Sequence, residues 1–201
     1  MCIRDSRISG YYYPDSTIAG FSHTHLSGTG AGDLYDISYM PVTLPYREAE
    51  APLGIHSKFR HSDEEASAGY YRVLLKDYNI NVELTATERC GIQRYTFPKA
   101  QSAVFLNLKK AMNWDFTQDS HIEVVDSCTI QGYRFSDGWA RGQRVFFRTR
   151  FSKPFRSSEI DTTAIIQDGK TIGTAYVARF NFDTTDGEEI CLLYTSDAAD
   201  E

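Results

Sequence analysis

Two strands and the turn between them are encoded by residues 70–86, YYRVLLKDYNINVELTA. Aromatic and β-branched residues dominate positions 70–75, a turn-like Lys-Asp-Tyr-Asn follows, and apolar residues then alternate with polar ones from Ile80 to Ala86. Strict alternation is typical of a strand that buries one face. The stretch therefore predicts two consecutive strands, the second of them half-buried.

Comparable strands follow at close spacing through the rest of the chain. They are expected at residues 94–97, 104–108, 122–125, 129–135, 145–151, 165–167, 171–172 and 176–182, and Asp168-Gly169 is a strong hairpin signal. Only residues 63–68 have a briefly helical composition. Eight or more strands separated by Gly and Pro turns predict an all-β fold, an antiparallel β-sandwich.

The composition argues against several classes of protein. The 201 residues suit one domain, the formal net charge of −6 argues against a nucleic-acid surface, and no apolar run is long enough to span a membrane. The cysteines lack Cys-x-x-Cys spacing, so zinc and redox motifs are not indicated. Cys90 and Cys128 are expected to be packed thiols, with a disulfide between them as the alternative.

The two ends of the chain can be encoded by one DNA sequence read on opposite strands. Residues 1–6 read MCIRDS and residues 191–201 read CLLYTSDAADE, and together they resemble the translated transposon adapter used to prepare sequencing libraries. We therefore expect both ends to be adapter-derived and residues 7–190 to be a fragment of a longer protein. Two unrelated natural tails are the alternative.

A polar loop is expected at residues 20–33, GFSHTHLSGTGAGD. Its four glycines allow tight turns and close approach, while its His, Ser, Thr and Asp side chains supply hydrogen-bond donors and acceptors. This combination favours a site for a small polar ligand. A glycine-rich connection with solvated polar residues is the alternative.

The residue types of this loop are compatible with several kinds of chemistry. His23 and His25 would share one face of a strand and could form a metal pair, with Asp33, His56 or His61 as a third ligand that spacing does not select. Contact with a ligand and structural hydrogen bonding are the other roles open to both histidines. The loop matches neither a dinucleotide fingerprint nor a nucleophile elbow.

Other polar and aromatic residues carry weaker signals. Glu64 and Glu65 are expected on a solvated face, and Asp33 is expected either to accept hydrogen bonds from loop amides or to take part in catalysis. The tyrosines at 11–13 and Trp139 could stack against sugars, although burial in the core is the more common role of aromatic residues.

The loop at residues 20–33 resembles the signature loop of family 92 of the glycoside hydrolases, the exo-acting α-mannosidases. Further matching blocks are EEASAGYY at 64–71, ELTATER at 83–89 with RYTFP at 94–98, Gly132-Tyr133-Arg134 with Gly138-Trp139, and FSKPF at 151–155. The resemblance covers nearly all of residues 7–190. It departs from the family at Ala68, where proline is usual, and at Gln93, where a titratable histidine is usual.

This resemblance implies an N-terminal β-sandwich of the galactose-mutarotase-like supersandwich type. A C-terminal (α/α)6 barrel, absent from this chain, would follow it, with the active site between the two. The parent is expected to be a calcium-dependent, inverting exo-α-mannosidase that acts on mannose-bearing glycans, in a secreted, periplasmic or cell-surface bacterial location. The catalytic carboxylates and the calcium ligands belong to the helical domain.

The resemblance also assigns a role to the polar loop. We expect it to line the pocket for the terminal mannose, and the binding residues it implies are His23, His25, Ser27, Gly28, Gly30 and Asp33. No catalytic or metal-binding residue is expected in this fragment, which should be inactive without its helical partner domain. A free-standing carbohydrate-binding module and a metal-dependent hydrolase using His23 and His25 are the alternatives.

Overall fold

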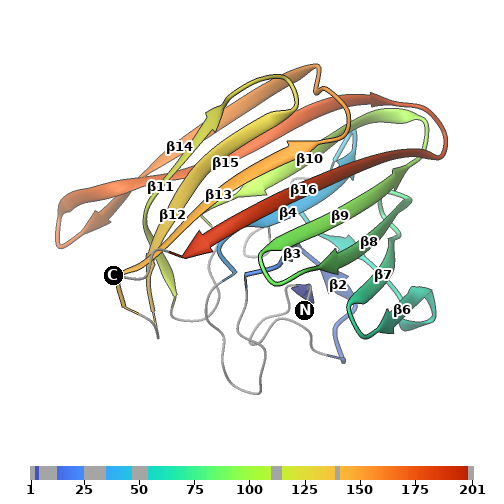
Figure 1. Cartoon of the computed structure of the whole chain (residues 1–201), viewed down its shortest axis with the longest axis horizontal. Helices are drawn as coiled ribbons and strands as arrows, with labels where there is room; N and C mark the ends of the chain where they lie inside the picture. Colours follow the sequence, from blue (N-terminus) through green and yellow to red (C-terminus); the bar gives the residue numbers. More distant parts are fainter. Residues whose placement is uncertain are drawn as a thin grey trace.

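The computed structural model describes residues 3–4, 13–24, 35–46, 54–109, 115–138 and 141–198. Across these residues the chain forms an antiparallel β-sandwich, which confirms the predicted fold class (Figure 1). Two large sheets face each other, and the short strands β2 (Thr17–Ile18) and β5 (Ser57–Lys58) form a third sheet. The described part of the chain includes no helix long and apolar enough to cross a membrane.

The larger sheet has eight strands in the order β11-β12-β13-β16-β9-β8-β7-β6. Their bounds are β6 Glu64–Ser67, β7 Tyr70–Leu75, β8 Ile80–Ala86, β9 Cys90–Phe97, β11 Phe116–Val124, β12 Thr129–Asp137, β13 Gln143–Phe151 and β16 Glu188–Ala198.

The smaller sheet has six strands in the order β1-β3-β4-β10-β15-β14. Their bounds are β1 Ile3–Arg4, β3 Phe21–Ser22, β4 Ser38–Thr43, β10 Ala100–Asn107, β14 Ser157–Gln167 and β15 Lys170–Thr184. In both sheets the paired strands run antiparallel.

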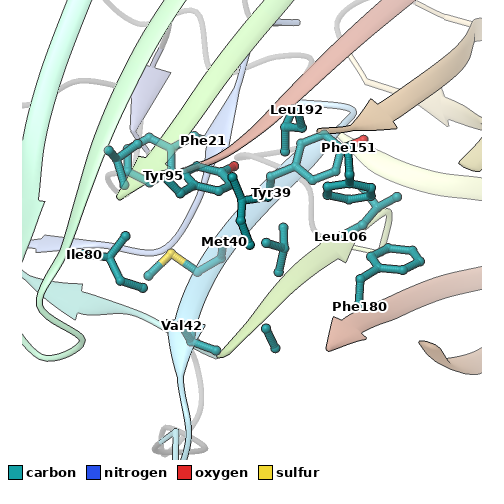
Figure 2. Close-up of a cluster of buried hydrophobic side chains, with 14 of the residues drawn as sticks. Phe21, Tyr39, Met40, Val42, Ile80, Tyr95, Leu106, Phe151, Phe180 and Leu192 are labelled. Atoms are coloured by element: carbon teal, nitrogen blue, oxygen red, sulfur yellow. The ribbon is translucent and has the colours of Figure 1, made fainter. Parts of the chain in front are cut away.

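The facing sides of the two sheets share one hydrophobic core. Figure 2 shows side chains of β4 and β10 in one cluster with side chains of β8, β9, β13 and β16. A hydrogen bond crosses the same interior, because the Tyr39 hydroxyl lies 2.5 Å from Thr149 Oγ1. The alternation predicted for β8 is confirmed: Ile80, Val82 and Leu84 are buried, and the residues between them are not.

The hairpin predicted at Asp168-Gly169 is also confirmed. Gln167 pairs with Lys170, and the two turn residues have φ values of 50° and 75°. Positive φ at both central positions is the conformation of a type I′ turn, which Asp-Gly favours. Cys90 and Cys128 are half-buried free thiols, so the structure contains no disulfide between them.

The helical interpretation of residues 63–68 is wrong. His61–Asp63 forms a single 3-10 turn, and Glu64–Ser67 is strand β6, which pairs with β7 at the edge of the larger sheet. A helix this short is unstable in water, whereas a strand at this position gains ladder hydrogen bonds. The sequence carries no alternating signal for β4, because five of its six residues are buried.

Strand β16 lies in the middle of the larger sheet and continues past Ile190. Residues 191–195 pair with β9, and residues 192–198 pair with β13. The side chains of Leu192 and Tyr194 are buried in the core. Residues expected to be adapter-derived therefore complete the central strand, while their origin and the domain limits 7–190 stay a prediction.

Candidate functional site

The polar loop leaves strand β3 and returns to the sheet at β4. Of its candidate binding residues, His23 is described, while His25, Ser27, Gly28, Gly30 and Asp33 lie outside the described residues. The two ends of the loop are joined by hydrogen bonds to Thr24: the Tyr35 amide donates to its carbonyl at 2.7 Å, and the Asp36 amide donates to its Oγ1 at 3.2 Å. The loop is therefore closed at its base.

The exit of the loop has a strained backbone. Tyr35 has a φ of 70°, a left-handed conformation that a bulky residue rarely adopts. Its side chain is fully buried, and its hydroxyl accepts a hydrogen bond from Ser38 Oγ at 3.0 Å. Gly20 makes room for this arrangement, since a Cβ there would lie 2.7 Å from the Tyr35 hydroxyl. Strain of this kind persists only where surrounding contacts determine it, and it is concentrated at functional sites.

His23 is held against β9 and β16 of the larger sheet. Its amide donates to the Tyr194 hydroxyl at 2.9 Å, and the two rings lie 5.1 Å apart at a tilt of 58°. Gly91 of β9 permits this contact, because a Cβ there would lie 2.5 Å from His23 Cδ2 and 2.7 Å from Tyr194 Cε1. Burial lowers the pKa of His23 to about 4, so the imidazole is neutral at neutral pH.

Gln93 lies two residues after Gly91 and faces the same interior. It is fully buried, and its Oε1 accepts a hydrogen bond from the Tyr95 hydroxyl at 2.5 Å. Burial raises the pKa of Tyr95, which keeps that hydroxyl protonated as a donor. Gln93 Nε2 has no hydrogen-bond partner among the described residues.

A buried ion-pair network lies next to the loop, and the residue types alone did not predict it. Arg134 of β12 is fully buried, and its Nη1 donates to Asp36 Oδ1 at 2.5 Å and to Asp115 Oδ2 at 3.2 Å. Gln143 Nε2 donates to the second oxygen of Asp36 at 3.0 Å. In the sequence, Arg134 belongs to the Gly132-Tyr133-Arg134 block that matches the family, but the resemblance implies no function for this residue.

The remaining histidine candidates lie in separate surroundings. His61 Nδ1 is 2.5 Å from Glu64 Oε2 and its ring stacks on Tyr13 at 4.1 Å, while His56 Nδ1 lies 3.0 Å from the Gly54 carbonyl oxygen. The described residues contain no group of three potential metal ligands. A metal pair of His23 with His25 stays a prediction, because His25 lies outside the described residues.

The expectation of solvated carboxylates holds for one of the two glutamates. Glu65 has 59% of its side chain exposed, whereas Glu64 has 9% exposed and accepts a hydrogen bond from the Tyr71 hydroxyl at 2.5 Å. Successive side chains of a strand point to opposite faces of the sheet, so Glu64 and Glu65 of β6 have different exposures. The helical interpretation placed both glutamates on one solvated face. Tyr13 is exposed, and Trp139 lies outside the described residues.

The family of the chain follows from comparison with known proteins. The model of the glycosyl hydrolase family 92 N-terminal domain matches residues 3–194. The chain belongs to this family. The family 92 domain is also similar to a solved family GH92 α-mannosidase from Bacteroides thetaiotaomicron in complex with mannoimidazole, with 30% identity and a TM-score of 0.85 over 98% of this chain.

More distant structures share the fold of the family 92 domain. A family GH92 inverting mannosidase from Bacteroides thetaiotaomicron VPI-5482 is 20% identical, with a TM-score of 0.73 over 97% of this chain and 26% of its own. A GH92 glycosyl hydrolase named ccman5 is 22% identical, with a TM-score of 0.66 over 96% of this chain and 28% of its own. This chain spans 28% of the mannoimidazole-bound relative. No curated protein sequence matches it significantly.

Proposed function

We propose that this domain is the N-terminal part of an exo-α-mannosidase that acts on mannose-bearing glycans, and that its polar loop lines the pocket for the terminal mannose. The observation that carries the proposal is the 30% identity, over 98% of this chain, to an α-mannosidase solved with mannoimidazole. A C-terminal helical domain would supply the catalytic carboxylates. The fragment by itself would then bind sugar weakly and turn over no mannoside.

The loop residues suit the recognition of sugar hydroxyls. A neutral His23 imidazole offers one donor and one acceptor, and a histidine at position 25 and the Ser27 and Asp33 side chains would add further partners. Backbone amides near Gly28 and Gly30 could approach a ligand closely because no Cβ intervenes. The Asp36 amide donates to Thr24 Oγ1, which brings the two described ends of the segment that carries these residues together.

The described part of this chain does not fit a calcium site. Its carboxylates form no group of three ligands, and the buried carboxylates of Asp36 and Asp115 already accept hydrogen bonds from Arg134, whose positive charge opposes a cation. We propose that the calcium ligands, and the acid and base of an inverting mechanism, belong to a helical domain of the parent enzyme, as the family resemblance implies.

Extending the gene past the codon for Ile190 from the source DNA tests this proposal. Two results together would support it. The continuation should encode a long helical domain with paired carboxylates, and the extended product should hydrolyse an aryl α-mannoside while the 201-residue chain does not. A stop codon directly after Ile190, or turnover by the short chain alone, would contradict it.

The alternative of a free-standing carbohydrate-binding module makes a different prediction. Such a module would bind mannose at millimolar strength or tighter with no other domain present. Isothermal titration of the 201-residue chain with mannose separates the two proposals. An absence of binding heat would exclude the free-standing binding module and would agree with a pocket that needs its partner domain.

A further inference from the structure

The ion-pair network around Arg134 is not explained by stability alone. Its guanidinium is fully buried together with the Asp36 carboxylate, and Asp115 is nearly so. Removing such charges from water is costly, and apolar side chains of similar volume often serve stability equally well. The network also leaves Arg134 Nη2 without a hydrogen-bond partner among the described residues, although that atom is buried. Buried donors in native structures usually have a partner, so this one calls for an explanation.

The location of the network indicates what it does instead. Asp36 is the first residue after the strained Tyr35, and its amide donates to Thr24 Oγ1 at 3.2 Å across the base of the loop. Its two carboxylate oxygens are held separately, one by Arg134 Nη1 and the other by Gln143 Nε2. The closing pair of the loop is therefore connected through one side chain to strands β12 and β13.

Arg134 is itself fixed in orientation by contacts with both sheets. Its Nε donates to Thr117 Oγ1 of β11 at 2.9 Å and to the carbonyl of Leu108, the residue after β10, at 3.2 Å. The planar guanidinium presents its donors in a rigid fork, so these contacts set the direction in which Nη1 meets Asp36. A lysine could neutralise the carboxylate but could not make both sets of contacts at once.

We propose that Arg134 is a positioning residue for the polar loop, fixing Asp36 and thereby the strained, closed base of the loop against the larger sheet. The identity of the ligand that the loop holds rests on the proposed mannosidase function, whereas the mechanical link from Arg134 to the loop base does not. The two claims can therefore fail separately.

Amide hydrogen exchange, followed by NMR on the 201-residue chain, tests the link. In Arg134→Ala we expect the Tyr35 and Asp36 amides to exchange about tenfold faster, the effect of losing one hydrogen bond to a charged group, while the Val104 and Leu106 amides of β10 keep their wild-type rates. Equal acceleration at all four amides would show a purely global effect and overturn the proposal. Unchanged rates at Tyr35 and Asp36 would overturn it as well.

Chemical rescue adds a readout that general destabilisation would not produce. Millimolar guanidinium chloride should restore protection of the Tyr35 and Asp36 amides in Arg134→Ala by filling the space left by the side chain, and sodium chloride at the same concentration should not. Equal effects of the two salts would count against a specific contact.

Two further variants test the same link if Arg134→Ala does not fold: one removes the charge of Asp36, and the other is a control. Asp36→Asn keeps the size of the side chain but removes its charge, so it should accelerate the same two amides, and wild-type rates there would overturn the proposal. Arg94→Gln is the matched control, because Arg94 forms a comparable pair with Glu83 (Nε to Oε2 2.7 Å) on a more exposed part of the same sheet. It should leave the Tyr35 and Asp36 amides unchanged.

A mannose titration of the same samples separates the two proposals. Accelerated exchange in Arg134→Ala supports the positioning role. If neither the wild-type chain nor a product extended past Ile190 then binds mannose, the proposed ligand is contradicted while the positioning role stands. Unchanged exchange at the Tyr35 and Asp36 amides of Arg134→Ala, combined with mannose binding by the extended product, contradicts the positioning role and leaves the proposed ligand supported.

Discussion

At the scale of single residues, the site is built by contacts that no local sequence pattern encodes. His23 follows strand β3, but its neighbours Gly91 and Tyr194 are distant in sequence and belong to β9 and β16. The sequence identified His23 as a candidate through its loop, and could not predict that a missing side chain on β9 makes room for the ring. The partners of Arg134 were missed for the same reason, since residues 36, 115 and 134 meet only in the folded chain.

The half-buried imidazole of His23 should make stability depend on pH. Its pKa falls from 6.5 in the unfolded chain to about 4 in the folded one, so between these values the unfolded state binds more protons and stability decreases as pH falls. The loss should begin near pH 6.5 and approach a limit below pH 4, with a total of up to about 3.5 kcal/mol at about 1.4 kcal/mol per pKa unit. Denaturant unfolding at a series of pH values measures it.

A variant of His23 assigns this pH dependence. His23→Asn should flatten the profile between pH 6.5 and 4.5, because it removes the group whose pKa is lowered. The lowered pKa values of Glu83, Glu159 and Glu188 contribute stability that is lost only as pH falls below about 4.5, outside this window. Identical profiles for wild type and His23→Asn would show that His23 is not buried as described.

At the scale of elements, strands with one solvated face could be predicted and fully buried strands could not. Strand β8 alternates in sequence and in burial, and the Asp168-Gly169 turn forms as its residue types require. Strand β4 does not alternate, because five of its six residues are buried. Residues 63–68 were misassigned because the short stretch has polar and small residues compatible with a helix, and only pairing with β7 decides between the two structures.

The hydrogen bond between Tyr39 of β4 and Thr149 of β13 should couple the two sheets energetically. Tyr39→Phe or Thr149→Val leaves one buried hydroxyl without this partner and should cost about 1–3 kcal/mol. The double variant should lose less than the sum of the single variants, because no hydroxyl of the pair then remains buried. Denaturant unfolding of all four proteins forms the cycle, and additive losses would show that the bond contributes nothing specific.

At the scale of the whole molecule, the larger sheet depends on its central strand. Strand β16 is the only described connection between β13 and β9, so it joins the half of the sheet that carries Arg134 to the half that carries Gly91 and Gln93. The site therefore requires both halves in register. The resemblance of residues 191–201 to a translated adapter gives no sign that residues 191–198 occupy the middle of the sheet, because strand order depends on pairing between distant parts of the chain.

A chain ending at Ile190 should consequently fail to fold. The truncation removes every pair between β16 and β13, and it removes the buried Leu192 and Tyr194 side chains, each worth about 3 kcal/mol. Together with the lost hydrogen bonds between β16 and β13, this loss of free energy approaches the whole unfolding free energy of a typical domain, about 5–15 kcal/mol. We expect circular dichroism and size-exclusion chromatography to show an unfolded or aggregated product, while a chain ending at Ala198 stays folded. A monomer with wild-type melting temperature after truncation at Ile190 would mean that the two halves of the sheet hold together without β16, and that residues 191–198 contribute nothing to the site.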